Sequence, residues 1–120
     1  LKPVHTVEEI LLLRSRFPDS IRLFCVEHAQ NILGGAVMYL TAKTAHVQYT
    51  ASSSAGREIG ALDMLFFDLM ARFRDRPYFD FGISNEGDGR GLNLGLIEYK
   101  EGFGARTVTH DHYELACGVP

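Results

Sequence analysis

The sequence is poor in cysteine: it has only two, Cys25 and Cys117, far apart and without a Cys-x-x-Cys spacing. This pattern does not indicate a zinc or redox motif, and it favours two reduced thiols in the core and a cytosolic compartment. Long hydrophobic runs are missing as well. The longest uncharged stretches, such as residues 31–42, contain glycines and are too short to cross a bilayer. We therefore expect neither a membrane span nor a secretory signal.

The sequence also lacks a block of basic residues. Twelve Lys and Arg oppose fifteen Asp and Glu, a net charge of -3 that is spread along the chain. Duplex nucleic acid is therefore not an expected partner. With 120 residues, 46% of them hydrophobic and 22% charged, the composition predicts one globular domain over residues 1–120. The first residue is Leu1 rather than Met, which is compatible with a fragment of a longer, two-domain chain.

The hydrophobic pattern predicts helices and strands in an α+β order. Thr6 and Glu9 have the spacing of a capping box, which opens a helix over residues 6–17. The remaining expected elements are strands 21–27 and 32–41 around a turn at Gln30-Asn31, strand 45–51, a helix through 59–73, strand 78–83, a loop at 85–91, a helix at 92–101 closed by Gly102, and a final strand at 105–116.

The order of these elements predicts how the strands pair. Consecutive strands 21–51 form an antiparallel sheet, whereas the strand after the long helix lies parallel to the one before it. Alternation in the third strand places His46, Gln48 and Thr50 on one side, and Val47, Tyr49 and Ala51 on the other. The predicted fold is a mostly antiparallel mixed sheet with helices on both faces and one parallel βαβ crossover.

The passage from the third strand into the long helix is rich in small residues. Such a loop exposes backbone N–H groups at the positive end of a helix dipole, where a phosphate or carboxylate can bind. The candidate residues are Ser53, Ser54, Ala55, Gly56, Arg57 and Gly60. The loop matches neither a Walker motif nor G-x-G-x-x-G. A serine-rich N-cap that serves only the helix is the alternative.

Two motifs resemble a known family. Arg57-x-x-Gly60 is similar to the Arg/Gln-x-x-Gly-x-Gly/Ala signature of the GCN5-related N-acetyltransferase (GNAT) superfamily. A second pattern resembles the FemAB-like branch of that superfamily, and it consists of Tyr78-Phe79-Asp80-Phe81-Gly82 followed by Tyr99-Lys100-Glu101-Gly102-Phe103-Gly104. The resemblance covers most of the chain and implies a bacterial protein that corresponds to the C-terminal domain of a two-domain enzyme.

The resemblance implies transfer of an acyl or aminoacyl group from a carrier, acyl-CoA or acetyl-CoA, to a small-molecule or peptidyl amine. The loop amides would bind the pyrophosphate of the donor, between strands that splay apart. Tyr99 would be the acid near the leaving thiolate, or else a packing residue with its hydroxyl at the surface. Asp80 would be a base, or else an acceptor for backbone N–H groups. The stem of Lys100 would lie on apolar surface with its ammonium group in water.

Other interpretations stay open. Leu62 stands where the signature has a small residue and no base is obvious, which favours a non-catalytic half-domain or an interaction module. A metal-binding domain could use His110 and His112, on one face of the last strand, although no metal site is expected. An EF-hand at residues 85–91 is excluded because Leu96 stands where its closing glutamate belongs. A homodimer, or contact with a preceding domain of the same chain, is a plausible assembly.

Overall fold

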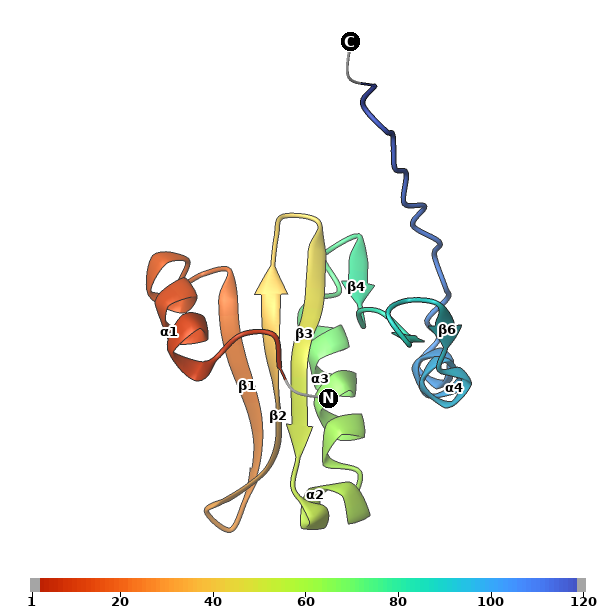
Figure 1. Ribbon diagram of the computed structural model, residues 1–120. Coiled ribbons are helices and arrows are strands. Elements are labelled where there is room, and N and C mark those ends of the chain that lie inside the picture. Colours follow the sequence, from red (N-terminus) through yellow and green to blue (C-terminus); the bar gives the residue numbers. More distant parts are fainter. Residues whose placement is uncertain (1–2, 119–120) are drawn as a thin grey trace. The chain divides into compact units, whose positions relative to one another are not determined.

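The computed structural model describes residues 3–118, which fall into two compact units, Leu1–Ile83 and Ser84–Pro120 (Figure 1). The first unit contains α1 (Val7–Arg16), β1 (Ile21–His28), β2 (Asn31–Leu40), β3 (Thr44–Ser52), α2 (Ser54–Glu58), α3 (Ala61–Arg72) and β4 (Tyr78–Asp80). The second contains β5 (Asn85–Glu86), β6 (Gly91–Leu92) and α4 (Leu94–Gly102). The single domain over residues 1–120 stays a prediction.

The first unit is built on a four-stranded sheet in the order β1-β2-β3-β4. The β1–β2 and β2–β3 pairs are antiparallel, whereas β3 and β4 are parallel. The connection between β3 and β4 runs through α2 and α3, which lie together beside the sheet (Figure 1). The predicted α+β fold, with a mostly antiparallel sheet and one parallel βαβ crossover, is confirmed.

The core lies between α3 and one face of the sheet. Met38 and Leu69 are its largest fully buried side chains. The other buried apolar residues of this unit are Ile21, Val26, Leu33, Ala36, Leu40, Ala45, Val47, Ala61, Leu65 and Phe66. We call the opposite side of the sheet, which carries Tyr39 and His46, the open face.

The first helix and hairpin follow the sequence pattern closely. The capping box is present: Glu9 N–H donates to the Thr6 hydroxyl at 3.2 Å and Thr6 N–H donates to Glu9 Oε2 at 2.7 Å. The hairpin turn is centred on Ala29-Gln30, one residue earlier than predicted. Both residues have left-handed backbones, with φ of 48° and 65°, and such turns match the twist of the flanking strands.

A β-bulge in β3 changes the predicted alternation. Met38 faces Val47, but Val37 faces Tyr49, so Gln48 is the extra residue. Directly opposite residues share a face of the sheet, and Tyr49 therefore joins His46 and Gln48 on the open face. The predicted sides of Tyr49, Thr50 and Ala51 are therefore wrong, because alternation cannot indicate a bulge.

Two predicted elements are interrupted by glycines with left-handed backbones. Gly60, with φ of 68°, separates the short α2 from α3, so the long helix is not continuous. Gly82, with φ of 76°, lies just beyond the shortened β4, whose predicted range extended to residue 83. Asp80 Oδ1 accepts the Gly82 N–H at 2.8 Å and fixes this turn.

The second unit contains a small hairpin and one helix. β5 and β6 form an antiparallel pair within the predicted polar loop. Asn93 caps α4 by accepting the Leu96 N–H at 2.9 Å. Gly102 is the last residue of the helix, and Gly104, with φ of 88°, provides the left-handed turn that the prediction gave to Gly102.

Two further predictions are wrong. Residues 106–118 are exposed and contain no strand, although their alternation is typical of one. A strand requires a partner that takes up its backbone hydrogen bonds, and periodicity does not supply that partner. Cys25 and Cys117 are free thiols, as expected, but both are exposed rather than buried in the core.

Among residues 3–118, no helix is both long and apolar enough to cross a membrane.

Candidate active site

The loop after β3 is closed by its own serines. Ser53 is the N-cap of α2, and its hydroxyl accepts the Gly56 N–H at 3.0 Å. The Ser53 N–H and hydroxyl both donate to Leu33 O, at 2.9 Å and 3.2 Å. Ser52 donates to the same carbonyl at 3.2 Å. The predicted N-cap alternative is therefore real for Ser53, which stays exposed together with Ser54 and Ala55.

Arg57 braces the loop from outside. Its guanidinium donates to Ser52 O at 2.7 Å and to the Ser54 hydroxyl at 3.2 Å, while the residue stays exposed. The side chain thus holds a positive charge over the end of β3. This position suits an anionic ligand of the loop, because the cation is fixed before the ligand arrives.

Gly56 has a packing role that the sequence did not indicate. A β-carbon here would overlap Leu33 O and would stand 2.8 Å from Ser52 Oγ. The close approach of α2 to β2 therefore requires glycine at this position. Gly56 is buried, so it serves the packing of the loop rather than contact with a ligand.

Gly60 and Leu62 lie where the signature motif ends. Gly60 is the N-cap of α3 and has no side chain with which to cap that helix. The first N–H groups of a helix have no partner inside the helix, and this end of α3 already carries a carboxylate, since Asp63 Oδ2 would stand 3.2 Å from a β-carbon on Gly60. Leu62 is half-buried, and its Cδ2 would stand 3.3 Å from a β-carbon on Gly34. The large side chain thus packs on β2.

β3 and β4 diverge within the sheet. Their parallel ladder contains three residue pairs and ends at His46↔Asp80. Beyond this point β3 continues for six residues, 47–52, with no partner strand on the β4 side among the described residues. This separation agrees with the predicted splay of the two strands. The backbone of β3 can bind an extended ligand here, and the strand leads directly into the Ser53 loop.

Three polar side chains form a chain at the point of divergence. His46 Nδ1 lies 2.7 Å from Asp80 Oδ2, and His46 Nε2 lies 3.1 Å from Gln48 Oε1. The His46 side chain is 31% exposed and that of Asp80 is 50% exposed, so solvent reaches both. The sequence predicted that Asp80 points away from the side of Phe79 and Phe81. Its pairing with His46 on the open face agrees with that prediction.

The open face holds further polar aromatic groups that the sequence did not single out. His5 Nδ1 lies 2.7 Å from the Tyr49 hydroxyl, and the rings of Tyr39 and His46 are 6.5 Å apart. The Tyr39 hydroxyl is buried and has no hydrogen-bond partner within the described residues. Burial raises the pKa of Tyr39 above its usual 10.0, and the nearby Tyr49 adds to the increase. The sequence could not indicate this cluster, because the bulge at Gln48 brings Tyr49 to the open face and alternation does not predict a bulge.

Tyr99 and Lys100 belong to the second unit. Tyr99 lies on α4, is 39% exposed and packs edge-to-face on Phe103 with ring centres 5.3 Å apart. The packing role predicted as one alternative for Tyr99 is present. Lys100 Nζ donates to the Ser84 hydroxyl at 2.9 Å, so its ammonium group is not simply in water.

The residues considered for metal binding lie apart from any ligand cluster. His110 and His112 are in the exposed segment 106–118, which is not a strand, so the shared-face argument for them is wrong. Within residues 3–118, no three His, Cys, Asp or Glu side chains come together as a metal site.

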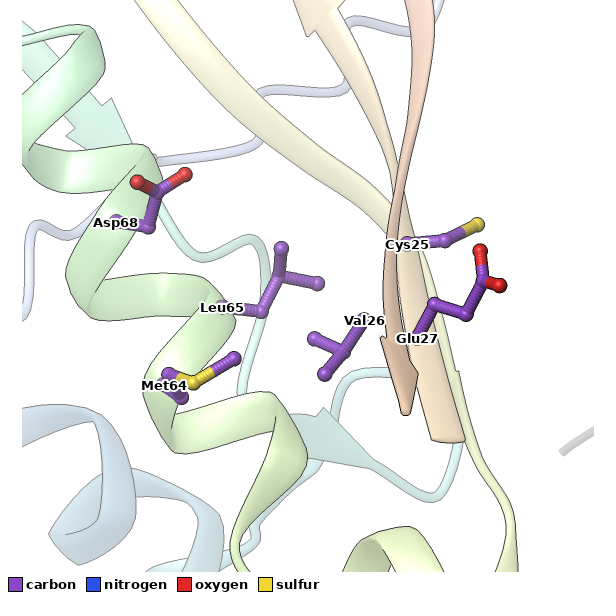
Figure 2. Close-up of a pocket in the computed structure, with 6 residues that line it drawn as sticks. All are labelled: Cys25, Val26, Glu27, Met64, Leu65 and Asp68. Atoms are coloured by element: carbon purple, nitrogen blue, oxygen red, sulfur yellow. The ribbon is translucent and has the colours of Figure 1, made fainter. Parts of the chain in front are cut away.

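A pocket of about 350 Å³ lies between β1 and α3 (Figure 2). Val26 and Leu65 point toward one another inside it, whereas Cys25 and Glu27 point away from the helix. Its other lining residues are Met64 and Asp68. The pocket is at the opposite edge of the sheet from β4. The charged side chain on its helix wall is the acidic Asp68, which does not favour a donor that carries phosphates.

Comparison with known proteins agrees with this arrangement. The model of the acetyltransferase (GNAT) domain family matches residues 2–101. The chain therefore belongs to the GNAT acetyltransferase family. No curated protein matches the sequence.

A solved structure shares the fold. It is described as a GNAT family acetyltransferase from Elizabethkingia anophelis with acetyl-CoA bound. The similarity has a TM-score of 0.59 at 16% identity, and it covers 91% of this chain and 74% of the other. At this level of identity the match shows that the two proteins have a GNAT-like fold in common.

Proposed function

We propose that this chain transfers an acyl group from coenzyme A to an amine, with acetyl-CoA as the simplest donor. The observation that carries the proposal is the end of the β3–β4 ladder at His46↔Asp80, on the strand that leads into the Ser53 loop. Residues 47–52 of β3 span about 20 Å at about 3.3 Å per residue, which offers a long backbone edge to an extended pantetheine arm.

The donor's phosphates fit the far end of this edge. Arg57 supplies a fixed positive charge there, and the start of α3 at Gly60 supplies N–H groups and the positive end of the helix dipole. Leu62 does not argue against this fit, since its side chain packs against Gly34 of β2. Among the predicted donor residues, Ser54, Ala55, Arg57 and Gly60 are thus the contacts that we propose, and Ser53 and Gly56 shape the loop.

The proposed reaction needs no covalent intermediate on the protein. An amine attacks the thioester carbonyl, the new C–N bond replaces the C–S bond, and the thiolate leaves. Catalysis then comes mainly from holding the two substrates together and from dipoles near the carbonyl oxygen. In this proposal Tyr99 remains the candidate donor of a proton to the thiolate, and Asp80 acts on the acceptor side.

We also propose membership in the FemAB-like branch, on the basis of Asp80-Phe81-Gly82 and Phe103-Gly104. Phe81 packs edge-to-face on Phe66 of α3 and on Phe79, with ring centres 5.2 Å and 5.0 Å apart. These aromatic contacts, together with the Gly82 turn, hold Asp80 at the ladder end. A branch member could use an aminoacyl carrier in place of acyl-CoA, and the experiment below separates the two donors.

Calorimetric titration with acetyl-CoA and with coenzyme A tests the proposal. We expect micromolar binding of both by the wild-type protein and a loss of at least tenfold in affinity for Arg57→Ala, because a charge-assisted contact to phosphate is removed. Arg72→Ala is the matched control, since Arg72 pairs with Asp68 on α3.

If Arg57→Ala binds acetyl-CoA with unchanged affinity, the donor does not bind at the Ser53 loop. Absence of any binding heat by folded wild-type protein would instead favour an aminoacyl carrier or a non-catalytic module.

A further inference from the structure

We propose that His46 is the base that accepts the proton of the attacking amine, and that Asp80 is its positioning residue. This inference rests on the proposed acyl transfer and assigns the acceptor side of the same site. Of the two roles expected for Asp80, it replaces that of the base and keeps that of an acceptor for backbone N–H groups, since Asp80 accepts the Gly82 N–H.

The contacts of Asp80 favour the positioning role. One carboxylate oxygen accepts the Gly82 N–H at 2.8 Å and the other lies 2.7 Å from His46 Nδ1. Both oxygens are thus engaged within the protein. An ionised carboxylate only accepts hydrogen bonds, so it keeps a proton on Nδ1 and directs the lone pair of a neutral imidazole to Nε2.

The partner of Nε2 indicates what the site stabilises. Gln48 Oε1 lies 3.1 Å from Nε2, and an amide oxygen is also an acceptor. With acceptors at both ring nitrogens, the arrangement suits the doubly protonated imidazolium, which is the state of the base after it has taken a proton.

The surroundings of His46 suit an amine acceptor. The side chain lies at the last pair of the β3–β4 ladder, where the splayed edge of β3 begins, and it is partly exposed. The Tyr39 ring lies beside it, and the buried Tyr39 hydroxyl has no partner within the described residues. Such a hydroxyl requires a ligand or water as a partner. Aromatic rings also attract an ammonium group before it loses its proton.

The step balances as follows. The amine nitrogen forms a bond to the thioester carbonyl carbon, and the electrons of the C–S bond leave with the sulfur. The proton released by the nitrogen passes to His46 Nε2, and Asp80 Oδ2 and Gln48 Oε1 accept the two N–H groups of the imidazolium. The thiolate takes a proton from water, and His46 returns its proton to solvent.

The test measures thiol release from acetyl-CoA with a panel of primary amines, using the best amine for all variants. For His46→Ala we expect at least a hundredfold lower kcat with the KM for acetyl-CoA within a factor of two, because general bases contribute about 10²- to 10⁴-fold. Added imidazole should restore a large part of the rate. His28→Ala, which removes an exposed histidine from β1, is the matched control and should be unchanged.

Asp80 is tested by a change that keeps the Gly82 contact. The side-chain oxygen in Asp80→Asn can still accept the Gly82 N–H, whereas the charge facing His46 is lost. We expect about a tenfold lower kcat, an unchanged KM for acetyl-CoA, and partial rescue in Asp80→Glu.

The outcomes separate this inference from the proposed function. If wild-type protein binds acetyl-CoA and releases thiol, yet His46→Ala keeps its rate or gains nothing from imidazole while folded, His46 is not the base. If wild-type protein does not bind acetyl-CoA, the proposed function fails first, and the base assignment fails with it.

Discussion

The α-carbon of Gly56 faces Leu33 O so closely that a β-carbon on residue 56 would overlap that oxygen. The same carbonyl accepts hydrogen bonds from Ser52 and Ser53, so the start of α2 is anchored to one residue of β2. The candidate donor loop is therefore rigidly attached to the sheet at its first turn.

Gly56→Ala should destabilise the first unit by about 1–3 kcal/mol, because the added methyl group forces α2 away from β2. Chemical denaturation measures the change. Gly102→Ala is the control: nothing lies within 4 Å of its β-carbon, and alanine favours helix, so no loss is expected. Equal stability of Gly56→Ala and wild type would mean that α2 is not held against Leu33.

Gly60 determines where α3 begins. At φ of 68° a residue with a β-carbon costs about 1–2 kcal/mol, and asparagine costs less than alanine. We expect Gly60→Ala to bind acetyl-CoA more weakly than Gly60→Asn, because the alanine variant relaxes the turn that aims the helix N-terminus. Calorimetry on both variants compares them directly, and a stronger affinity for the alanine variant would contradict the proposed phosphate position.

Arg57→Lys separates charge from geometry. Lysine keeps the positive charge but cannot donate to both Ser52 O and the Ser54 hydroxyl in the planar arrangement of a guanidinium. We expect an affinity for acetyl-CoA between those of wild type and Arg57→Ala. If Arg57→Lys binds as weakly as Arg57→Ala, the brace matters more than the charge.

Tyr39 makes the free energy of unfolding depend on pH in the alkaline range. Its pKa is raised in the folded protein, so the unfolded chain ionises first as the pH rises above 10.0. The folded state then holds more protons than the unfolded state, and the free energy of unfolding decreases with increasing pH. Below this range the residue adds no pH dependence.

Tyr39→Phe should remove this part of the alkaline loss. At neutral pH the change should be close to neutral or slightly stabilising, since the hydroxyl has no partner among the described residues. Thermal unfolding of both proteins below and above pH 10.0 measures the effect. An identical alkaline slope in the two proteins would show that Tyr39 ionises no later when folded.

The sequence was sufficient to predict most of the first unit. The capping box of Thr6 and Glu9, the three antiparallel strands and the parallel crossover follow from local patterns that tertiary packing reinforces. The bulge at Gln48 could not be predicted, because a bulge depends on the partner strand. The segment 106–118 shows the converse, since its alternation has no partner strand in the structure.

The candidate site was predicted only in part. The loop was identified from its small residues before a helix, and Arg57 from its place in the Arg57-x-x-Gly60 motif. The apolar neighbours of Asp80 placed it on the correct face of the sheet. The sequence placed His46 beside Gln48 on one face of a strand, where substrate contact and a polar outer face both stayed open, because the contact that decides its role is with Asp80, 34 positions away. Gly56 looked like part of an anion loop until its distance to Leu33 showed a packing role.

The most direct test of the proposed donor site is the backbone amide NMR spectrum of the protein during titration with acetyl-CoA. The account predicts the largest shifts at residues 54–62 and along 47–52 of β3, with small changes at Cys25, Glu27 and Asp68 around the pocket beside β1. Shifts centred on that pocket, or no shifts at all in folded protein, would contradict it.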